Sequence, residues 1–223
     1  MLKKKRLALI AIIISSFMVL TACSSIDPSS YVVNQLDALF KAEFEAASED
    51  TGDSVERYQQ EREEMLNAFV HEVEREVGLA LTDEHRESLM DAFDSLLRQA
   101  QYEVVSHERV DDNYEVTLRI RPIMNLLEAN ENMDEAEMEA AMLAYFLDRG
   151  FDLENPDGTE DLEELMALVV DFTIDTMIAV LEDVSHGEEE EITVTVIRDT
   201  DERVIYMSEP ELERLTLAIM PVQ

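Results

Sequence analysis

Cysteine, tryptophan and glycine are scarce in this sequence, and each scarcity excludes a class of structure or chemistry. Cys23 is the only cysteine among 223 residues, so disulfides within the chain and metal sites with two or more cysteine ligands are excluded. The twelve methionines and the absence of tryptophan indicate an adaptable apolar core rather than an aromatic binding platform. The five glycines do not cluster, so the sequence offers no Gly-rich loop to bind phosphate groups.

Catalytic sequence motifs are also missing. The chain contains neither a Gly-x-Ser-x-Gly elbow nor a His-Glu-x-x-His zinc motif. None of the four histidines has the sequence context of a catalytic base paired with a nucleophile. We expect each of them to be a solvated or strand-edge residue. They are His71, His85, His107 and His186. We therefore predict no catalytic residue, no cofactor and no enzymatic activity.

Positive charge is scarce as well. Lysine and arginine together number 17 against 52 aspartates and glutamates, and Lys41 is the only lysine after residue 5. Such an acidic surface repels nucleic acid and anionic lipid headgroups, so neither is an expected partner. Cations and basic peptides would be attracted instead. A surface low in lysine and rich in acids suits a saline medium, which screens the self-repulsion of the acids. The preference for arginine over lysine also suits an alkaline medium, because guanidinium keeps its charge where an ammonium group begins to lose its proton.

Long apolar runs are absent except at the N-terminus. The cluster Lys3-Lys4-Lys5-Arg6 precedes sixteen mostly apolar residues, 7–22. This run is short for a bilayer span, which needs about 20 residues. No second run of that length occurs. The charged segment, the apolar segment and the small residues before Cys23 together predict a cleaved signal peptide.

The end of the signal peptide, Leu20-Thr21-Ala22-Cys23, resembles the bacterial lipobox at all four positions. The resemblance implies that the Cys23 sulfur receives a diacylglyceride, that cleavage follows Ala22, and that the new amino terminus often receives a further acyl chain such as palmitate. Two or three acyl chains anchor a protein firmly. We therefore predict a lipid-anchored protein on the extracytoplasmic face of the cell membrane. With residues 1–22 removed, 13 basic side chains would remain against 52 acidic ones, a net charge near −39.

The periodicity of apolar residues predicts one acidic domain over 31–220, joined to the lipid by a tether over 23–30. Helical spacing covers about 30–47, 53–77, 82–97, 133–146, 159–184 and 208–219. Alternating strands cover 102–110, 114–121, 192–196 and 204–207. The predicted fold is α+β, with about six helices on an antiparallel sheet of two hairpins and roughly four strands. Helices followed by a hairpin occur twice, which hints at an internal duplication. The segment 159–184 is apolar on most sides and is expected to be the central buried helix.

The whole chain resembles a group of uncharacterised surface lipoproteins from low-GC Gram-positive bacteria. The matching features are the lipobox, the opening helix YVVNQLDALFKAEF over Tyr31–Phe44, and the later alternation of helices and hairpins. The resemblance implies the location and the architecture. It brings no known activity and no known site.

A degenerate calcium loop follows the fourth predicted helix. Asn155, Asp157, Asp161 and Glu164 occupy ligand positions of a twelve-residue calcium loop. Leu153 stands where the first carboxylate is required, however, and Pro156 interrupts the pattern. The alternative is an ordinary turn that leads into a helix capped by Thr159.

Two further clusters carry charge in positions of interest. Asp171 and Asp175 lie four residues apart in the most apolar predicted helix. They could bind a cation or share a proton, or they could belong to one solvated edge of the helix. Arg119 and Arg121 lie on the same face of a predicted strand. They either pair with nearby acidic side chains or form an anion-binding site. Arginine suits an anion site because its guanidinium recognises carboxylates with two hydrogen bonds.

Three functions remain open at this point. The leading hypothesis is a non-enzymatic binding or interaction module that uses its sheet face or a helix–sheet cleft. The first alternative is a low-affinity binder of divalent cations at the cell surface. The second alternative is a hydrolase whose site assembles from scattered carboxylates.

Overall fold

The computed structural model describes residues 22–23, 26–78, 80–125, 135–151, 159–199 and 204–221. The elements in chain order are β1 (Ala22–Cys23), α2 (Pro28–Leu36), η1 (Asp37–Lys41), α3 (Glu45–Thr51), α4 (Val55–Val77), α5 (Asp83–Leu97), β2 (Gln101–Val110), β3 (Asn113–Arg121), α7 (Glu135–Asp148), α8 (Thr159–Glu182), β4 (Glu190–Asp199), β5 (Val204–Met207) and α9 (Glu209–Ile219). The predicted α+β class is confirmed, whereas the predicted internal duplication stays a prediction.

The sheet is antiparallel throughout, with the strand order β1-β5-β4-β3-β2. The two predicted hairpins, β2–β3 and β4–β5, join through the pairing of β3 with β4, and the two-residue β1 adds to the edge of β5. Side chains of β3 alternate between the two faces. Val116, Leu118 and Ile120 are buried against helices, and Thr117 and Arg119 lie on the opposite face.

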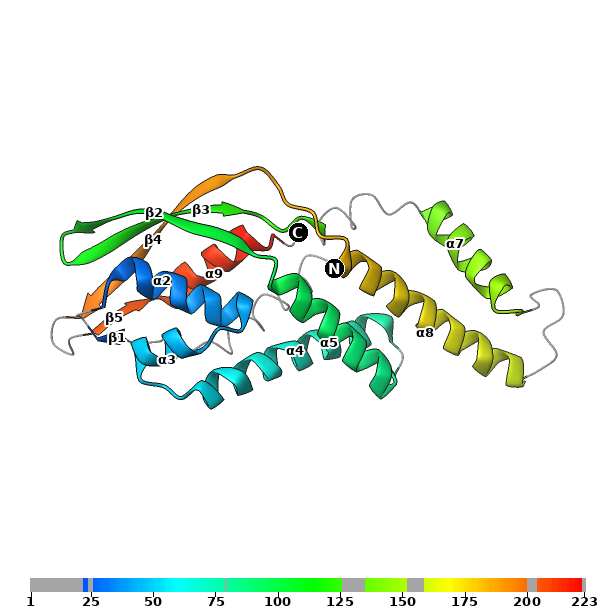
Figure 1. The fold of residues 1–223 in the computed structure, drawn as a ribbon. Coiled ribbons are helices and arrows are strands. Elements are labelled where there is room, and N and C mark those ends of the chain that lie inside the picture. The colour runs from blue at the N-terminus through cyan, green and yellow to red at the C-terminus, as the bar shows by residue number, and fades with distance from the viewer. Residues whose placement is uncertain are drawn as a thin grey trace.

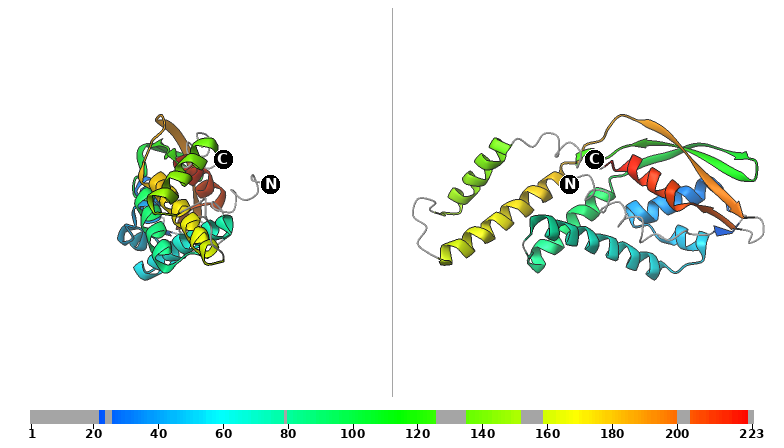
Figure 2. Two further views of the ribbon diagram at one scale, coloured as in Figure 1. Left: turned by 90° about the vertical axis from the view of Figure 1, so that its right-hand side faces the viewer. Right: turned by 180° about the vertical axis from the view of Figure 1, so that it is seen from behind.

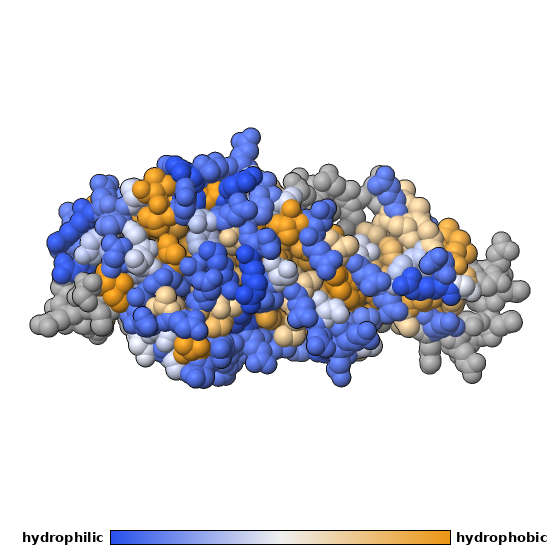
Figure 3. Space-filling view, in the orientation of Figure 1, coloured by the Kyte–Doolittle hydropathy of each residue, from blue (hydrophilic) through white to orange (hydrophobic). Residues whose placement is uncertain are grey.

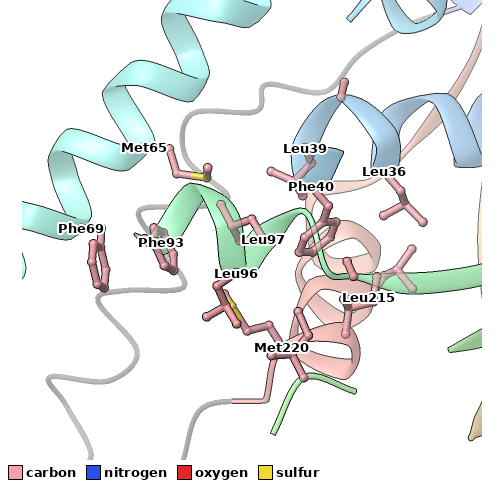
Figure 4. Packing of buried hydrophobic residues seen from close by; sticks show 14 of the residues in the cluster. Leu36, Leu39, Phe40, Met65, Phe69, Phe93, Leu96, Leu97, Leu215 and Met220 are labelled. Atoms are coloured by element: carbon pink, nitrogen blue, oxygen red, sulfur yellow. The ribbon is translucent and has the colours of Figure 1, made fainter. Parts of the chain in front are cut away.

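Helices cover the apolar face of the sheet in two layers. α2 and α9 lie directly against the sheet, and α4 and α5 form the next layer (Figures 1 and 2). Side chains of α5 lie between those of α4 and η1 in the core that Figure 4 shows. Phe93 of α5 stacks on Phe69 of α4 with 4.0 Å between ring centroids, and both rings are buried. The centre of the core is therefore the packing of helix on helix under the sheet.

The first helix is interrupted, which corrects the continuous helix predicted over 30–47. α2 ends at Leu36, η1 continues as a π-helical turn to Lys41, and Ala42 is left-handed with a φ of 57°. A left-handed residue cannot continue a right-handed helix, so α3 begins anew at Glu45. The apolar spacing predicted helical segments here but contains no signal for the break between them.

Arg62 of α4 holds this interrupted segment in place. Its side chain is almost completely buried, donates to the carbonyl oxygen of Leu39 at 2.6 Å, and lies 2.6 Å from a carboxylate oxygen of Asp94. Burial lowers the pKa of Arg62 even though Asp94 acts in the opposite direction. A buried guanidinium requires such partners, because leaving it without hydrogen bonds would cost several kcal/mol. This one side chain therefore joins α4, α5 and η1.

Each of the six predicted helices starts within two residues of a helix start in the structure. α5, predicted from residue 82, is capped by Thr82, whose hydroxyl oxygen accepts from the backbone N–H of His85 at 3.1 Å. α4, predicted from residue 53, is capped by Ser54. Asp53 forms an ion pair with Arg57 at 2.6 Å, one turn further on. Either residue type suits a cap, and the sequence pattern does not discriminate between neighbours.

The prediction that 159–184 is the central buried helix holds for only part of α8. Ile174 and Leu181 are buried in the main core, whereas Leu162 and Met166 are exposed. The beginning of α8 extends past the core and packs on α7 (Figure 1). Among the described residues, no helix is both long enough and apolar enough to cross a bilayer.

Candidate functional site

The predicted anion site on the open face of the sheet is centred on Arg119. Its guanidinium lies 2.7 Å from Glu103, 3.0 Å from Glu189 and 3.3 Å from Glu191. Hydrogen bonds to Glu103 and Glu191, together with the negative charge of Glu189, raise the pKa of Arg119. An incoming anion would have to displace the carboxylates that already surround this cation. Arg121 is exposed on the same face, and an anion site at the pair stays a prediction.

Most of the predicted calcium loop lies outside the described residues. Asn155 and Asp157 fall in the gap between 151 and 159, and the side chain of Asp161 is not described. Glu164 is exposed on α8. Within the described ranges, no three His, Cys, Asp or Glu side chains gather as a metal site would require. Cation binding at this loop stays a prediction.

Asp171 and Asp175 of α8 face two different helices. One oxygen of Asp171 lies 3.1 Å from Nε2 of His85 on α5. Asp175 accepts a hydrogen bond of 2.8 Å from the hydroxyl of Tyr145 on α7, and Arg149 lies 3.7 Å from it. Both carboxylates are partly exposed, but each one links α8 to a neighbouring helix. This arrangement favours a structural role over a shared proton.

The histidines make contacts that the sequence did not predict in detail. His85 is only 20% exposed, although the helix pattern placed it on a solvated surface. Nδ1 of His107 lies 2.6 Å from the hydroxyl oxygen of Ser29, which is the spacing of a nucleophile with its base. Among the described residues, no carboxylate pairs with His107 to orient it. The absence of enzymatic activity stays a prediction.

A second apolar cluster lies at one end of the molecule, in a segment that we call the arm (residues 135–151 and 159–172). α7 packs antiparallel on the beginning of α8 and projects from the rest of the fold (Figures 1 and 2). The buried residues of this cluster are three phenylalanines, Phe146, Phe151 and Phe172. The ring of Phe146 meets that of Phe151 edge-on, with 6.4 Å between centroids. This core is small and separate from the main one.

The arm also carries most of the large apolar side chains that the described residues expose. The exposed fractions are 45% for Leu143, 59% for Leu147, 57% for Leu162 and 44% for Met166. The remaining two such residues, Val105 and Val110, lie on β2. Apolar colour gathers over α7 at the right-hand end of Figure 3, whereas hydrophilic colour dominates the rest of that face. Exposed apolar patches of this kind mark interaction surfaces.

α7 is apolar on two opposite faces. The face toward α8 contributes Met138, Met142, Tyr145 and Phe146 to the small cluster. At about 100° per residue, the opposite face consists of five exposed residues. These are Ala136, Ala140, Leu143, Ala144 and Leu147. A helix that only covers a core has one apolar face, so the second face requires a different explanation.

The inner face of α7 is fixed in place by a polar arrangement around Tyr145. The guanidinium of Arg149 lies over the Tyr145 ring, 3.4 Å from its centroid. Burial, with the hydrogen bond to Asp175, raises the pKa of Tyr145 to about 12. The edge-on contact with Phe172, 5.3 Å between centroids, completes the contact between α7 and α8. These contacts orient α7 so that Leu143 and Leu147 point away from α8.

The sequence predicted the helix of the arm but not its outer surface. Helical spacing predicted a helix over 133–146, and no binding surface was predicted at Leu143 or Leu147. The signal was present, because apolar residues at 136, 140, 143, 144 and 147 follow the same helical spacing one half-turn away. Periodicity alone does not tell which of two apolar faces is covered by the fold.

Cys23 lies at the opposite end of the molecule from the arm. It pairs with Val204 at the edge of β5, and β1 is at the left of Figure 1 whereas α7 is at the right. α2 begins at Pro28, inside the predicted tether, so four residues separate Cys23 from the first helix. The five steps along the chain from Cys23 to Pro28 span at most about 17 Å. A lipid on Cys23 would therefore hold this end of the fold close to the bilayer.

Comparison with known proteins supports the fold and shows no family for this chain. No family model matches the chain, and no curated protein matches it. Among solved structures, it is similar to the Bacillus subtilis protein ycdA, described as a candidate lipoprotein, with a TM-score of 0.51 and 13% sequence identity. The match covers 90% of this chain and 57% of the ycdA chain, so this chain spans a little over half the length of that neighbour. At this identity the similarity concerns the fold alone.

Proposed function

We propose that this protein is a lipid-anchored interaction module of the extracytoplasmic membrane face, and that the arm is its docking surface. The observation that carries the proposal is the exposure of Leu143, Leu147, Leu162 and Met166 on one projecting pair of helices. In a chain with 52 acidic residues, apolar side chains gathered in this way favour contact with another protein. The proposed function is non-enzymatic. It places the docking surface on the arm, whereas the sequence predicted it on the sheet face or in a helix–sheet cleft.

The position of the arm supports the proposal. With Cys23 held at the membrane, the arm would point away from the bilayer at the far end of an elongated fold (Figure 2). The fold shared with ycdA agrees with an anchored protein, since that neighbour is described as a candidate lipoprotein from Bacillus subtilis. A surface presented to the medium is suited to a partner protein.

The anchor is tested by acylation of Cys23. Metabolic labelling with palmitate should label the wild-type chain in its membrane fraction, and Cys23→Ser should lose the label. Cys23 is the only cysteine, so the variant leaves no other thiol to acylate. A wild-type chain that takes up no label, or a Cys23→Ser chain that keeps it, would contradict lipid anchoring through Cys23.

The docking surface is tested by affinity purification from native membranes. Leu143→Ser combined with Leu147→Ser should lose the proteins that co-purify with the wild-type chain. The matched control, Val105→Ser with Val110→Ser, changes two exposed valines on β2 and should retain them. Equal recovery from both double variants would move the docking surface away from α7, and no recovery with any chain would contradict an interaction module.

A further inference from the structure

We propose that the outer face of α7 docks a positively charged amphipathic helix of a partner protein. This inference rests on the proposed function and names the chemistry of the partner. The docking face consists of Leu143 and Leu147 with three alanines beside them, Ala136, Ala140 and Ala144. All five side chains are exposed.

The shape of this face fits a helix. From Ala136 to Leu147 it runs along the helix axis for about 16 Å, or three turns. The alanines follow each other at intervals of four residues and form a low ridge, beside which the two leucines project. Rows of side chains spaced by four residues are the ridges along which helices pack against one another, and small residues allow the two axes to approach closely. An extended strand would find no exposed backbone to pair with on α7, because helical hydrogen bonds occupy it.

The charge of the partner follows from the borders of the face. Glu137 and Asp148 lie along one border, and Glu139 lies along the other. All three are exposed. The neighbouring cation, Arg149, is turned to the inner side, where it contacts Tyr145 and Asp175. An apolar stripe between two acidic borders is complementary to a helix with an apolar stripe between basic borders.

Charge and position disfavour the other possible occupants. A second copy of this chain would bring the same acidic borders against each other, on molecules that each carry a net charge of −35 before any processing. An anionic bilayer would repel the same borders. The bilayer would also lie at the other end of the fold, beside Cys23 and β5 (Figure 1).

The test uses the full-length chain in phosphatidylcholine nanodiscs and a synthetic helical peptide, with leucines along one face and lysines along the others. Binding is measured by fluorescence anisotropy near physiological ionic strength, where long-range attraction is screened. A scrambled peptide of the same composition serves as the first control. We expect the amphipathic peptide to bind at least about tenfold more tightly than the scrambled one, because only the first presents a continuous apolar face.

Two pairs of variants locate the binding. Leu143→Ser with Leu147→Ser should weaken peptide binding at least about tenfold, and Val105→Ser with Val110→Ser should leave it unchanged. Glu139→Gln with Asp148→Asn should weaken binding several-fold and flatten its salt dependence, whereas Asp111→Asn with Asp112→Asn, on the β2–β3 turn, should not. All four changed leucine and acid side chains are exposed, so these variants are expected to fold normally.

Four results would overturn the inference. The first is equal affinity of the wild-type chain for the amphipathic and the scrambled peptide, and the second is unchanged peptide binding by the α7 variants. The third and fourth use a photoreactive residue at position 147: a crosslink to nanodisc lipid, or a crosslink to a second copy of the chain, in place of one to the peptide. If native membranes yield a partner that depends on Leu143 and Leu147 while the peptide does not bind, the proposed function stands and only the basic helix is wrong.

Discussion

The arm and the rest of the fold, which we call the body, use the same apolar residue types in different ways. In the body, α5 lies between other helices under a sheet, and Phe93, Leu96 and Leu97 are fully buried. In the arm, two helices share a core of three phenylalanines, and leucines of α7 and α8 face the solvent. The body thus uses its apolar residues for folding, whereas the arm leaves part of its apolar surface uncovered. We expect the two regions to respond differently to mutation and to pH.

The largest expected effect is in the body, at Phe93. Phe93→Ala removes a fully buried ring that stacks on Phe69, and should lower the free energy of unfolding by about 3–5 kcal/mol. Urea denaturation followed by circular dichroism measures this change. A loss below about 1 kcal/mol would mean that the core of the body is far less tightly packed than the structure indicates.

Arg62 tests whether the body also depends on a buried ion pair. Arg62→Ala removes the buried partner of the Leu39 carbonyl and leaves Asp94 with only the more exposed Arg98, so it should cost about 3 kcal/mol of unfolding free energy. Arg98 pairs with the same carboxylate but is 49% exposed, so Arg98→Ala should cost less than about 1 kcal/mol. The same denaturation experiment compares the two variants, and equal losses would contradict the role assigned to Arg62.

A smaller and local effect is expected in the arm, at Phe146. Phe146→Ala removes one of the three buried rings of this small cluster, in which the other packed apolar side chains are only partly buried. Local opening of α7 should become easier, so its amides should exchange hydrogen faster while those of α5 keep their protection. Hydrogen exchange followed by mass spectrometry resolves the two helices. Faster exchange in α5 to the same extent would show that arm and body unfold as one cooperative unit.

The pKa values of buried tyrosines offer a further way to compare the body with the arm. Burial raises the pKa values of Tyr31 and Tyr102 in the body far above that of an exposed tyrosine, and raises the pKa of Tyr145 in the arm to about 12. A folded-state pKa above the unfolded value of about 10 gives a contribution to stability that is complete below pH 10 and is lost as pH rises further. As pH rises, ultraviolet titration should detect the phenolate of Tyr145 before the protein unfolds. The phenolates of Tyr31 and Tyr102 should appear only when the protein unfolds. Simultaneous titration of all three would contradict the difference between the regions.

The sequence predicted the repeated elements of the fold better than its interruptions. Alternation over 102–110 and 114–121, and again before and after residue 200, predicted both hairpins, because a half-buried sheet imposes a period of two residues. The break at Ala42 was not predicted, since Arg62, which supports it, lies twenty residues further along the chain. Tertiary contacts of this kind leave no local pattern.

The candidate site shows the same limit. Arg119 was predicted with Arg121 as a possible anion site or as a partner of nearby acids. Its three carboxylate neighbours could not be known until β2, β3, β4 and the residue before β4 were placed side by side. Leu143 and Leu147 were visible in the sequence, but only the fold shows that α8 covers the opposite side of α7. Burial decides whether an apolar residue belongs to the core or to a binding surface.

The most direct test of the docking role is photo-crosslinking in intact cells. A photoreactive residue replaces Leu147 on α7 in one chain and Val110 on β2 in another, since both side chains are exposed and apolar. We expect a discrete crosslinked protein with the chain altered at position 147 and none with the chain altered at position 110. The same products from both positions, or none from position 147, would contradict the assignment of the arm as the docking surface.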